Sequence, residues 1–365
     1  MIRVLVILFA LFALRKGLKI LYGRYWDDGV AFDVRYSTTA TFEGKTVGFQ
    51  EHISSGRLPM PYFAACYEQS AHLCPTDPSG GSKNAGQHRE TFFNLKRKRK
   101  AARNTTLTCK KRGFYLIDRA TVRSSDIFLS QPYEKELPLY AALTVYPKEI
   151  EIDEDEIPYK TFYGEILKER FILPDPFAFR GIREYQSFDN FKQINFKAWA
   201  KTGTPMTNTY DYTISQEVLL ILNVQPYCEH ERAAVFEDAI RLAAFLAREY
   251  IEAGVSVCFA TNGLDCISHQ PTRTKKDQTE HSLTEIYDIL ARIDLQDNAN
   301  CMPITEFLPP HAARSAVTLI SSYADDTLYD WQRKATKSGA KLLWIAPCAP
   351  SDSLEYGDGI VVWQQ

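Results

Sequence analysis

Residues 218–260 read VLLILNVQPYCEHERAAVFEDAIRLAAFLAREYIEAGVSVCFA, and this stretch decides the fold of the C-terminal part of the chain. Its two ends, 218–224 and 255–260, are continuous apolar runs, which are typical of strands covered on both faces. Between them, apolar residues recur at helical spacing over 231–253, and Gly254 is placed to end the helix. A strand, a helix and a second strand in this order predict one βαβ unit of a parallel sheet.

The same alternation continues to the C-terminus. A helix is predicted from Ser282, which forms a capping box with the glutamate three residues later. Strands are predicted over 317–321 and 342–346, with a helix over 325–338 between them. Residues 215–365 are therefore predicted to form a doubly wound parallel sheet, in which ligands bind beyond the carboxyl ends of the strands.

The region before this sheet has a different pattern. Over residues 30–148, short segments of alternating apolar and polar residues are separated by turns, which predicts a β-sandwich domain. Residues 149–156 read EIEIDEDE, with six acidic residues in eight, and open a segment over 149–214 that we interpret as an acidic linker followed by a signature segment. A basic block at 96–100, KRKRK, is interpreted as a solvated face, with contact to anionic lipid headgroups as the alternative.

The N-terminal segment is strongly apolar. Residues 4–14 read VLVILFALFAL and as a helix cover about 16 Å of the roughly 30 Å of bilayer hydrocarbon. Extension to Tyr22 gives enough length but includes Arg15, Lys16 and Lys19. No small-residue cleavage site of a signal peptide follows, and the apolar residues cover every face, which argues against a buried core helix. Residues 1–24 are predicted to form a membrane helix that attaches the chain to the cell membrane, with the soluble domains facing the cytoplasm because basic residues follow the apolar run.

Composition and motifs exclude several functional classes. With 43 basic and 45 acidic residues the formal charge is -2, which does not indicate a nucleic-acid binder. The eight cysteines show no zinc-ligand spacing and are interpreted as free thiols. The loop over 223–231 has no glycine for a pyrophosphate, no G-x-S-x-G occurs, and Cys228, His230 and Glu231 have no second cluster with which to hold a metal. No enzymatic activity and no cofactor are predicted.

Arginines, acids and aromatic residues are concentrated in residues 175–201, DPFAFRGIREYQSFDNFKQINFKAWAK. The planar guanidinium group suits bidentate pairing with a carboxylate and stacking on aromatic rings. We favour an internal clamp that holds this segment onto the α/β domain, and the alternative is a docking surface for a partner. The candidate residues are Asp175, Arg180, Gly181, Arg183, Tyr185, Asp189, Lys192 and Trp199.

This segment resembles the signature of the domain of unknown function 58 family, which reads roughly G-x-R-x-Y-x-x-G-D-x-x-R-x-I-x-W followed by a basic residue. The matching positions are Gly181, Arg183, Tyr185, Asp189 and Ile194. The departures are Phe188 for glycine, Lys192 for arginine, Phe196 for tryptophan and Lys201 for the last arginine. Five upstream motifs also resemble the family's landmarks: FEGK from Phe42, RLPMP from Arg57, KRGFY from Lys111, SSDIF from Ser124 and VYP from Val145.

The resemblance implies a membrane protein with a β-sandwich and a von Willebrand factor A-like domain. Members commonly accompany MoxR-type AAA+ ATPases and are thought to assist the assembly or maturation of other proteins. The expected function is therefore that of a non-enzymatic, membrane-attached scaffold or assembly factor with a MoxR-type ATPase and membrane lipid as partners. The alternatives are a small-molecule-binding or enzymatic α/β domain, which needs a polar pocket beyond Asn223, and a surface adhesin, which needs export and a working metal site.

The resemblance also indicates where a metal would bind. Von Willebrand factor A domains with an adhesion site place D-x-S-x-S after the first strand, which gives Mg²⁺ a carboxylate and hydroxyl ligands. The matching positions here are Asn223, Gln225 and Tyr227. An amide and a phenol do not replace those ligands, so we expect a degenerate site without metal.

Overall fold

The structure is a computed structural model, which describes residues 2–76, 82–85, 88–94, 99–129, 131–170, 179–187, 189–210, 217–225, 233–274, 282–295, 301–306, 308, 316–348, 357 and 359–364. It is a β-rich, mixed α/β protein. It divides into two compact units, Met1–Lys148 and Glu149–Gln365, and each unit is described by itself.

Helix α1 (Ile2–Tyr25) has two environments along its length. Near its end, Tyr22 is buried in the core of the first unit, and its hydroxyl donates to the Pro59 carbonyl oxygen over 2.8 Å. Near its start, large apolar side chains are all more than half exposed: Val4, Leu5, Ile7, Leu8, Phe9, Leu11, Phe12 and Leu14. In the described part of the chain no helix is long and apolar enough to cross a membrane, so the predicted membrane-spanning helix is not found.

The first unit contains two sheets, as the alternating sequence pattern predicts. One has the order β1-β3-β8-β5 and the other the order β2-β10-β9-β4-β7-β6. The strands are β1 (Ala31–Tyr36), β2 (Ala40–Phe42), β3 (Thr46–Ser54), β4 (Phe63–Glu68), β5 (Leu73–Pro75), β6 (Ser82–Ala85), β7 (His88–Phe93), β8 (Lys100–Cys109), β9 (Gly113–Ser125) and β10 (Pro132–Tyr146).

One apolar core joins the two sheets. Phe49 and Leu107 come from the first sheet, and Phe63 and Leu143 come from the second; all four are fully buried in the same cluster. Burial of a large apolar side chain contributes about 1.5–3 kcal/mol relative to exposure. Alternation along the strands places such residues on the inner face of each sheet, which gives a sandwich.

The second unit is built on a mainly parallel sheet of order β15-β14-β13-β17-β18-β19. The five strands from β14 to β19 run parallel, while β15 lies antiparallel at the edge and β16 also pairs antiparallel with β14. The strands are β13 (Glu217–Leu222), β14 (Ser256–Asp265), β15 (Pro271–Arg273), β16 (Ile293–Asp294), β17 (Ala316–Ile320), β18 (Lys341–Pro347) and β19 (Ile360–Trp363).

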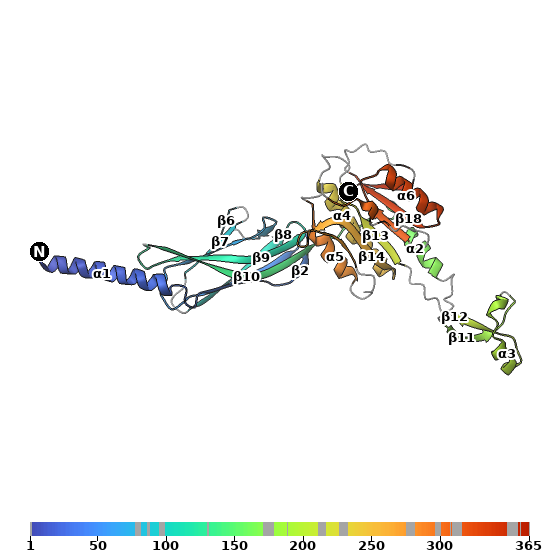
Figure 1. Cartoon of the computed structure of the whole chain (residues 1–365), viewed down its shortest axis with the longest axis horizontal. Helices are drawn as coiled ribbons and strands as arrows, with labels where there is room; N and C mark the ends of the chain where they lie inside the picture. The colour runs from blue at the N-terminus through green and yellow to red at the C-terminus, as the bar shows by residue number, and fades with distance from the viewer. Residues whose placement is uncertain are drawn as a thin grey trace. The chain divides into compact units, whose positions relative to one another are not determined.

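Helices pack on this sheet, as in a doubly wound fold (Figure 1). They are α4 (Ala233–Glu252), α5 (Ser282–Arg292) and α6 (Asp326–Lys337), and a short 3₁₀ turn covers Ile304–Glu306. Leu219 and Ile221 of β13 lie in one cluster with Leu328 of α6, while Leu220 between them is fully buried on the opposite face. The chain leaves α4 through Gly254 at φ +80°, a conformation that glycine adopts without strain, as predicted.

The acidic segment at the start of this unit packs more closely than a linker. Ile150, Ile152 and Ile157 are buried between its charges. Helix α2 (Tyr159–Arg170) follows, and its Tyr159 ring meets the Phe245 ring of α4 edge-on at 5.3 Å between centroids. The alternation of acidic residues with isoleucine thus gives an exposed acidic side and a buried apolar side.

Candidate functional site

Polar side chains gather at the carboxyl edge of the parallel sheet. Asn223 follows β13, Asn262 lies near the end of β14, and Ser321 follows β17. These strands are neighbours in the sheet, so their carboxyl ends meet at one place. All three side chains are at most 1% exposed. This edge is where the fold would place a ligand or metal.

The three side chains form one hydrogen-bonded network. Asn262 Nδ2 donates to Asn223 Oδ1 over 2.8 Å, and Asn223 Nδ2 donates to Ser321 Oγ over 2.8 Å. Ser321 Oγ in turn donates to the Tyr323 carbonyl oxygen over 2.6 Å. Backbone groups complete the set, because Gln225 N donates to Asn223 Oδ1 and Val224 N donates to Asn262 Oδ1. The network fixes the first residues after β13 and β17, which are 223–225 and 321–323.

This chemistry does not fit a hard divalent cation. Mg²⁺ prefers carboxylate and other oxygen ligands in octahedral geometry, whereas Asn223 Oδ1 is neutral and already accepts two hydrogen bonds. Gln225 contributes its backbone amide to the network, and Tyr227 lies outside the described residues. Within the described ranges, no group of three or more histidine, cysteine, aspartate or glutamate side chains is placed to hold a metal.

Asp325, the nearest acid after β17, has a structural role. Its Oδ1 accepts from Leu328 N over 2.8 Å and thereby caps the N-terminus of α6. The Thr327 hydroxyl donates to both carboxylate oxygens at 2.7 Å, and the Tyr323 hydroxyl donates to Oδ2 at 3.2 Å. The carboxylate therefore has its acceptor sites occupied by its own helix and loop.

These observations predict that divalent cations do not stabilise the protein. A ligand that binds only the folded state raises the melting temperature by mass action. We expect millimolar Mg²⁺ or Mn²⁺ to leave the melting temperature of the full chain unchanged in differential scanning fluorimetry. An upward shift that disappears in Asn223→Ala would contradict this prediction.

The signature segment forms a small module of its own over residues 179–210. Strands β11 (Phe179–Glu184) and β12 (Met206–Tyr210) pair antiparallel, and between them lie a 3₁₀ turn (Phe191–Gln193) and α3 (Phe196–Thr202). Asn195 caps α3, since its Oδ1 accepts from Ala198 N over 2.9 Å. We call this the signature module.

Arg183 and Asp189 form a bidentate ion pair within the signature module. Arg183 Nη1 donates to Asp189 Oδ2 over 2.6 Å, and Nη2 donates to Oδ1 over 2.5 Å. Gln186 N donates to the same carboxylate, and the Tyr185 hydroxyl donates to the Asp189 carbonyl oxygen. The pair thus closes the turn between β11 and the 3₁₀ turn. Both partners belong to the signature module, so this ion pair holds the module's own turn, and the clamp onto the α/β domain stays a prediction.

This ion pair makes the order of the turn depend on pH. Hydrogen bonds from Arg183, and then from Gln186 N, lower the pKa of Asp189 below its usual value. A lowered carboxyl pKa stabilises the folded turn above the usual value of about 3.9, and this contribution is lost as the pH falls through the folded-state pKa. We expect Arg183→Ala to raise the pKa of Asp189 towards its usual value and to move the loss of order to higher pH.

Carboxyl ¹³C titration by NMR measures this change directly. The matched control is Arg180→Ala, on the same strand, which we expect to leave the Asp189 titration in place. An unchanged Asp189 pKa in Arg183→Ala would show that the ion pair does not hold the turn.

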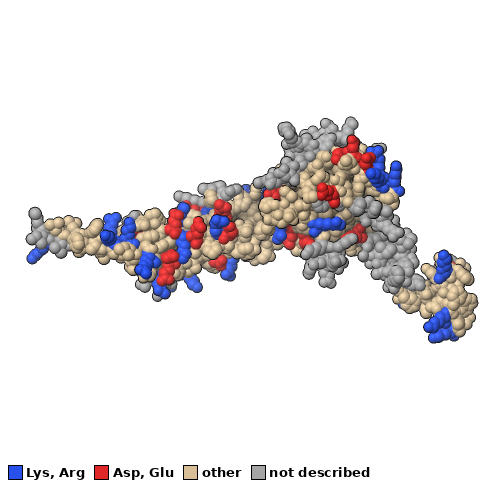
Figure 2. Space-filling view, viewed as in Figure 1, with Lys and Arg blue, Asp and Glu red and all other residues tan. Residues whose placement is uncertain are grey.

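The surface of the signature module is apolar and basic. Phe179, Ile182, Phe191 and Phe196 are between 44% and 69% exposed, and Trp199, stacked on Phe196 at 6.1 Å, is 37% exposed. Basic side chains flank them, and Figure 2 shows two basic patches on the module with uncharged surface between them. Among its described residues only Ile194 and Thr207 are buried.

The other predicted residues occupy varied positions. Arg180 sits at a bulge in the β11–β12 register, and a Cβ on Gly181 would approach only Thr209 Oγ1 at 3.6 Å, so no steric need for this glycine is visible. Lys192 lies in the 3₁₀ turn, where its backbone N–H donates to Asn190 Oδ1. Asp175 lies outside the described residues.

Sequence reasoning missed two members of the carboxyl-edge network, Asn262 and Ser321. Their signal is a polar residue at the end of an apolar strand, within FATNG and LISS. It also missed a buried ion pair in the sandwich between Glu51 and Arg89, whose signal is one charged residue in the inward alternation of β3.

Comparison with known protein families gives a match inside the second unit. Residues 181–347 match the family described as "Protein of unknown function DUF58". A comparison with curated proteins finds no match.

Solved structures resemble the chain over about a third of its length. A non-cellulosomal cohesin from Archaeoglobus fulgidus is 7% identical, with 35% of this chain and 96% of that chain covered and a TM-score of 0.23. The CARDB domain of a Pyrococcus furiosus protein, solved with di-metal ions, is 12% identical, with 32% and 94% covered and a TM-score of 0.22. The major pilin SpaD from Corynebacterium diphtheriae is 8% identical, with 34% and 39% covered and a TM-score of 0.26. Similarities this low carry no conclusion about this chain.

Proposed function

Because residues 181–347 belong to the DUF58 family, we propose that the chain is a non-enzymatic, membrane-attached scaffold or assembly factor that acts with a MoxR-type AAA+ ATPase. In this proposal the α/β unit is von Willebrand factor A-like, and a partner docks on the signature module. The mainly parallel sheet, with β15 and β16 pairing antiparallel to β14, is compatible with that fold.

The observation that carries the proposal is the exposed apolar surface of the signature module. A two-stranded ribbon with two buried residues among those described gains little from its own core, because independent stability needs more strands or packing against another element. Exposed aromatic side chains of this kind are enriched at protein interfaces. Contact with a partner would bury them and stabilise the module.

The charge of the signature module indicates the chemistry of that partner. Residues 179–210 hold five basic and two acidic residues, a net charge of +3. The basic residues are Arg180, Arg183, Lys192, Lys197 and Lys201. An acidic surface with apolar patches would complement this module and guide association at low salt.

The carboxyl-edge network supports docking that does not depend on a cation. Hydrogen bonds join the side chains of Asn223, Asn262 and Ser321. These uncharged side chains hold the edge of the sheet in place without a bound cation. A working adhesion site would instead need a carboxylate for the metal. A scaffold role uses the edge as a rigid framework.

Membrane attachment is assigned in this proposal to the first turns of α1. Their exposed apolar side chains would be buried in a bilayer, and Arg15, Lys16 and Lys19 would face anionic headgroups. We expect deletion of residues 2–17 to move the protein from the membrane pellet to the soluble fraction. The deletion stops there because Tyr22 and Trp26 belong to the sandwich core.

The control for this deletion is Tyr140→Ser, which removes a side chain that is 80% exposed in the same unit. We expect this variant to stay in the membrane pellet. Full-length protein that is recovered soluble without detergent would contradict membrane attachment.

Binding to the ATPase tests the proposed function. The full chain, in detergent, is immobilised and titrated with the purified MoxR-type ATPase of the same organism. We expect the double variant Phe191→Ser/Phe196→Ser to weaken binding by more than about tenfold, the effect of losing interface hot spots. Ile267→Ser, which removes an exposed apolar side chain outside the signature module, is the matched control and should bind normally. Absence of binding by the unmodified chain, or equal binding by the double variant, would refute the proposal.

A further inference from the structure

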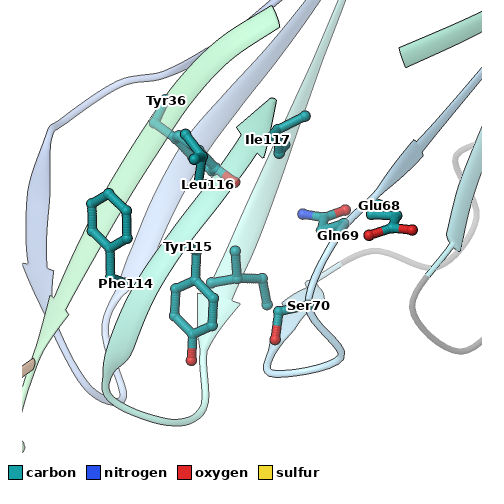
Figure 3. Close-up of a pocket in the computed structure, with 9 residues that line it drawn as sticks. Tyr36, Glu68, Gln69, Ser70, Phe114, Tyr115, Leu116 and Ile117 are labelled. Atoms are coloured by element: carbon teal, nitrogen blue, oxygen red, sulfur yellow. The ribbon is translucent and has the colours of Figure 1, made fainter. Parts of the chain in front are cut away.

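A pocket of about 360 Å³ opens in the β-sandwich unit, within the size range of ligand sites (Figure 3). One wall is formed by residues 114–117 of β9, and the other by the last residue of β4, Glu68, and the two residues after it. Tyr36 of β1 and Leu73 of β5 complete it from the other sheet. Aromatic and aliphatic side chains and the polar groups of residues 68–70 share the lining about equally.

The pocket runs along the edge of a strand. Successive side chains of a strand point to opposite faces of the sheet. The four consecutive residues 114–117 can therefore line the same pocket only because the pocket lies along the open edge of β9. The sheet pairing explains the opening. Strand β4 pairs with β9 from Phe63–Ser124 to Tyr67–Ala120 and then turns away, while β9 continues along β10 to Gly113. The pocket occupies the place that the next residues of a paired strand would fill.

Gln69 presents a buried donor in this pocket. The side chain is 7% exposed, and its Oε1 accepts from Arg89 Nη1 over 3.2 Å. Since a guanidinium group only donates, the amide oxygen must face Arg89 and the amide nitrogen must face away. That Nε2 is buried and has no hydrogen-bond partner among the described residues. Figure 3 shows it on the side of Gln69 that faces Ile117.

Tyr36 presents a second donor. Its hydroxyl oxygen is buried and has no hydrogen-bond partner in the part of the chain that the structure describes. Burial raises the pKa of Tyr36 well above its usual value, so the hydroxyl keeps its proton at neutral pH. Buried donors without an acceptor are costly, and such groups in a pocket indicate a ligand that accepts.

The charges nearby favour a neutral acceptor. Arg89 already pairs with Glu51 at 3.4 Å and donates to Thr105 as well as to Gln69. Glu68 lines the pocket and would repel a carboxylate. A peptide carbonyl is neutral and accepts from both amide and phenol donors.

We propose that this pocket binds an extended peptide segment of a partner protein, which adds as a strand to the edge of β9 and places an apolar side chain between Tyr36, Leu73 and Ile117. A main-chain carbonyl of the segment accepts from Gln69 Nε2 or the Tyr36 hydroxyl. Addition of a strand supplies main-chain hydrogen bonds for affinity and pockets for alternate side chains. The site belongs to the sandwich unit and does not depend on docking of an ATPase to the signature module.

A random dodecapeptide phage library, selected on the full chain in detergent, provides the probe. Ser70→Trp fills the pocket, and His72→Trp adds the same bulk two residues along the same loop without lining the pocket. Tyr36→Phe removes a hydroxyl that bonds to nothing described, so it should fold normally. We expect peptides with alternating apolar residues to be enriched, to lose binding to Ser70→Trp, and to keep it with His72→Trp.

Synthetic copies of the enriched peptides then test the donors and the location. We expect Tyr36→Phe or Gln69→Leu to bind them about fivefold more weakly, which is the effect of one lost hydrogen bond. Hydrogen exchange should show new protection of the backbone amides of residues 113–119. Equal enrichment on Ser70→Trp, no enrichment at all, or protection elsewhere would overturn the proposal.

Discussion

Replacement of Glu51 with alanine is expected to lower the free energy of unfolding of the sandwich unit by about 3–5 kcal/mol, because it leaves a buried charge without its partner. Glu51 is fully buried and Arg89 is 1% exposed. The carboxylate accepts from the Tyr67 hydroxyl at 2.7 Å, from the Thr91 hydroxyl at 2.8 Å and from Arg89. Total stabilities of about 5–15 kcal/mol make such a loss easy to measure in urea denaturation.

Two further variants distinguish the effect of an unpaired buried charge from the effect of losing side-chain packing. Glu134→Ala breaks an exposed pair with Arg123 and should change the unfolding free energy by no more than about 1 kcal/mol. The double variant Glu51→Leu/Arg89→Met removes both charges and should regain much of the loss. A small effect of Glu51→Ala would mean that water reaches Arg89.

Replacement of Asn262 with leucine is expected to destabilise the α/β unit by about 2–4 kcal/mol. The side chain accepts from Val224 N and donates to Asn223 Oδ1 and to the Met302 carbonyl oxygen. Leucine would leave the buried Val224 N–H without an acceptor, which alone costs about 1–3 kcal/mol. Chemical denaturation monitored by tryptophan fluorescence measures the change, since Trp344 lies in the core of this unit.

The control is Asn104→Leu, at an exposed position of β8 in the other unit, which should lie within about 0.5 kcal/mol of the unmodified chain. Equal effects of the two substitutions would show that the carboxyl-edge network contributes nothing to stability.

The parallel sheet was predictable because its strands are buried on both faces. Such strands form continuous apolar runs, and the runs at 218–224 and 342–346 correspond to β13 and β18 within two residues at each end. The helix predicted over 231–253 is α4, and its end at Gly254 follows from the conformational freedom of glycine. These predictions rested on the apolar pattern of each element and on the glycine that ends the helix.

Short and mixed elements were not predictable in this way. Strand β15 has three residues and is fixed by pairing with β14, which the local sequence does not contain. Helix α2 follows an acidic block. Its apolar residues pack against α4, and this contact is not visible in the local sequence. The expected membrane-spanning helix failed for another reason, because basic residues interrupt its apolar pattern and its last turns pack into the sandwich.

The candidate sites show the same limit. Arg183 and Asp189 are six residues apart, so their pairing was within reach of sequence reasoning. Asn223 and Ser321 are separated by 98 positions and meet only because β13 and β17 are neighbours in the sheet. The pocket beside β9 depends on the residue at which the pairing of β4 with β9 ends. The spacing of residues along the chain does not predict that position.

Hydrogen exchange of the full chain, with and without the purified MoxR-type ATPase, tests the central claim most directly. If the signature module is the docking surface, backbone amides over residues 179–210 should gain protection when the ATPase is present. The sandwich unit should exchange as before, which provides an internal control. Protection confined to residues outside 179–210, or no change at saturating ATPase, would contradict the account.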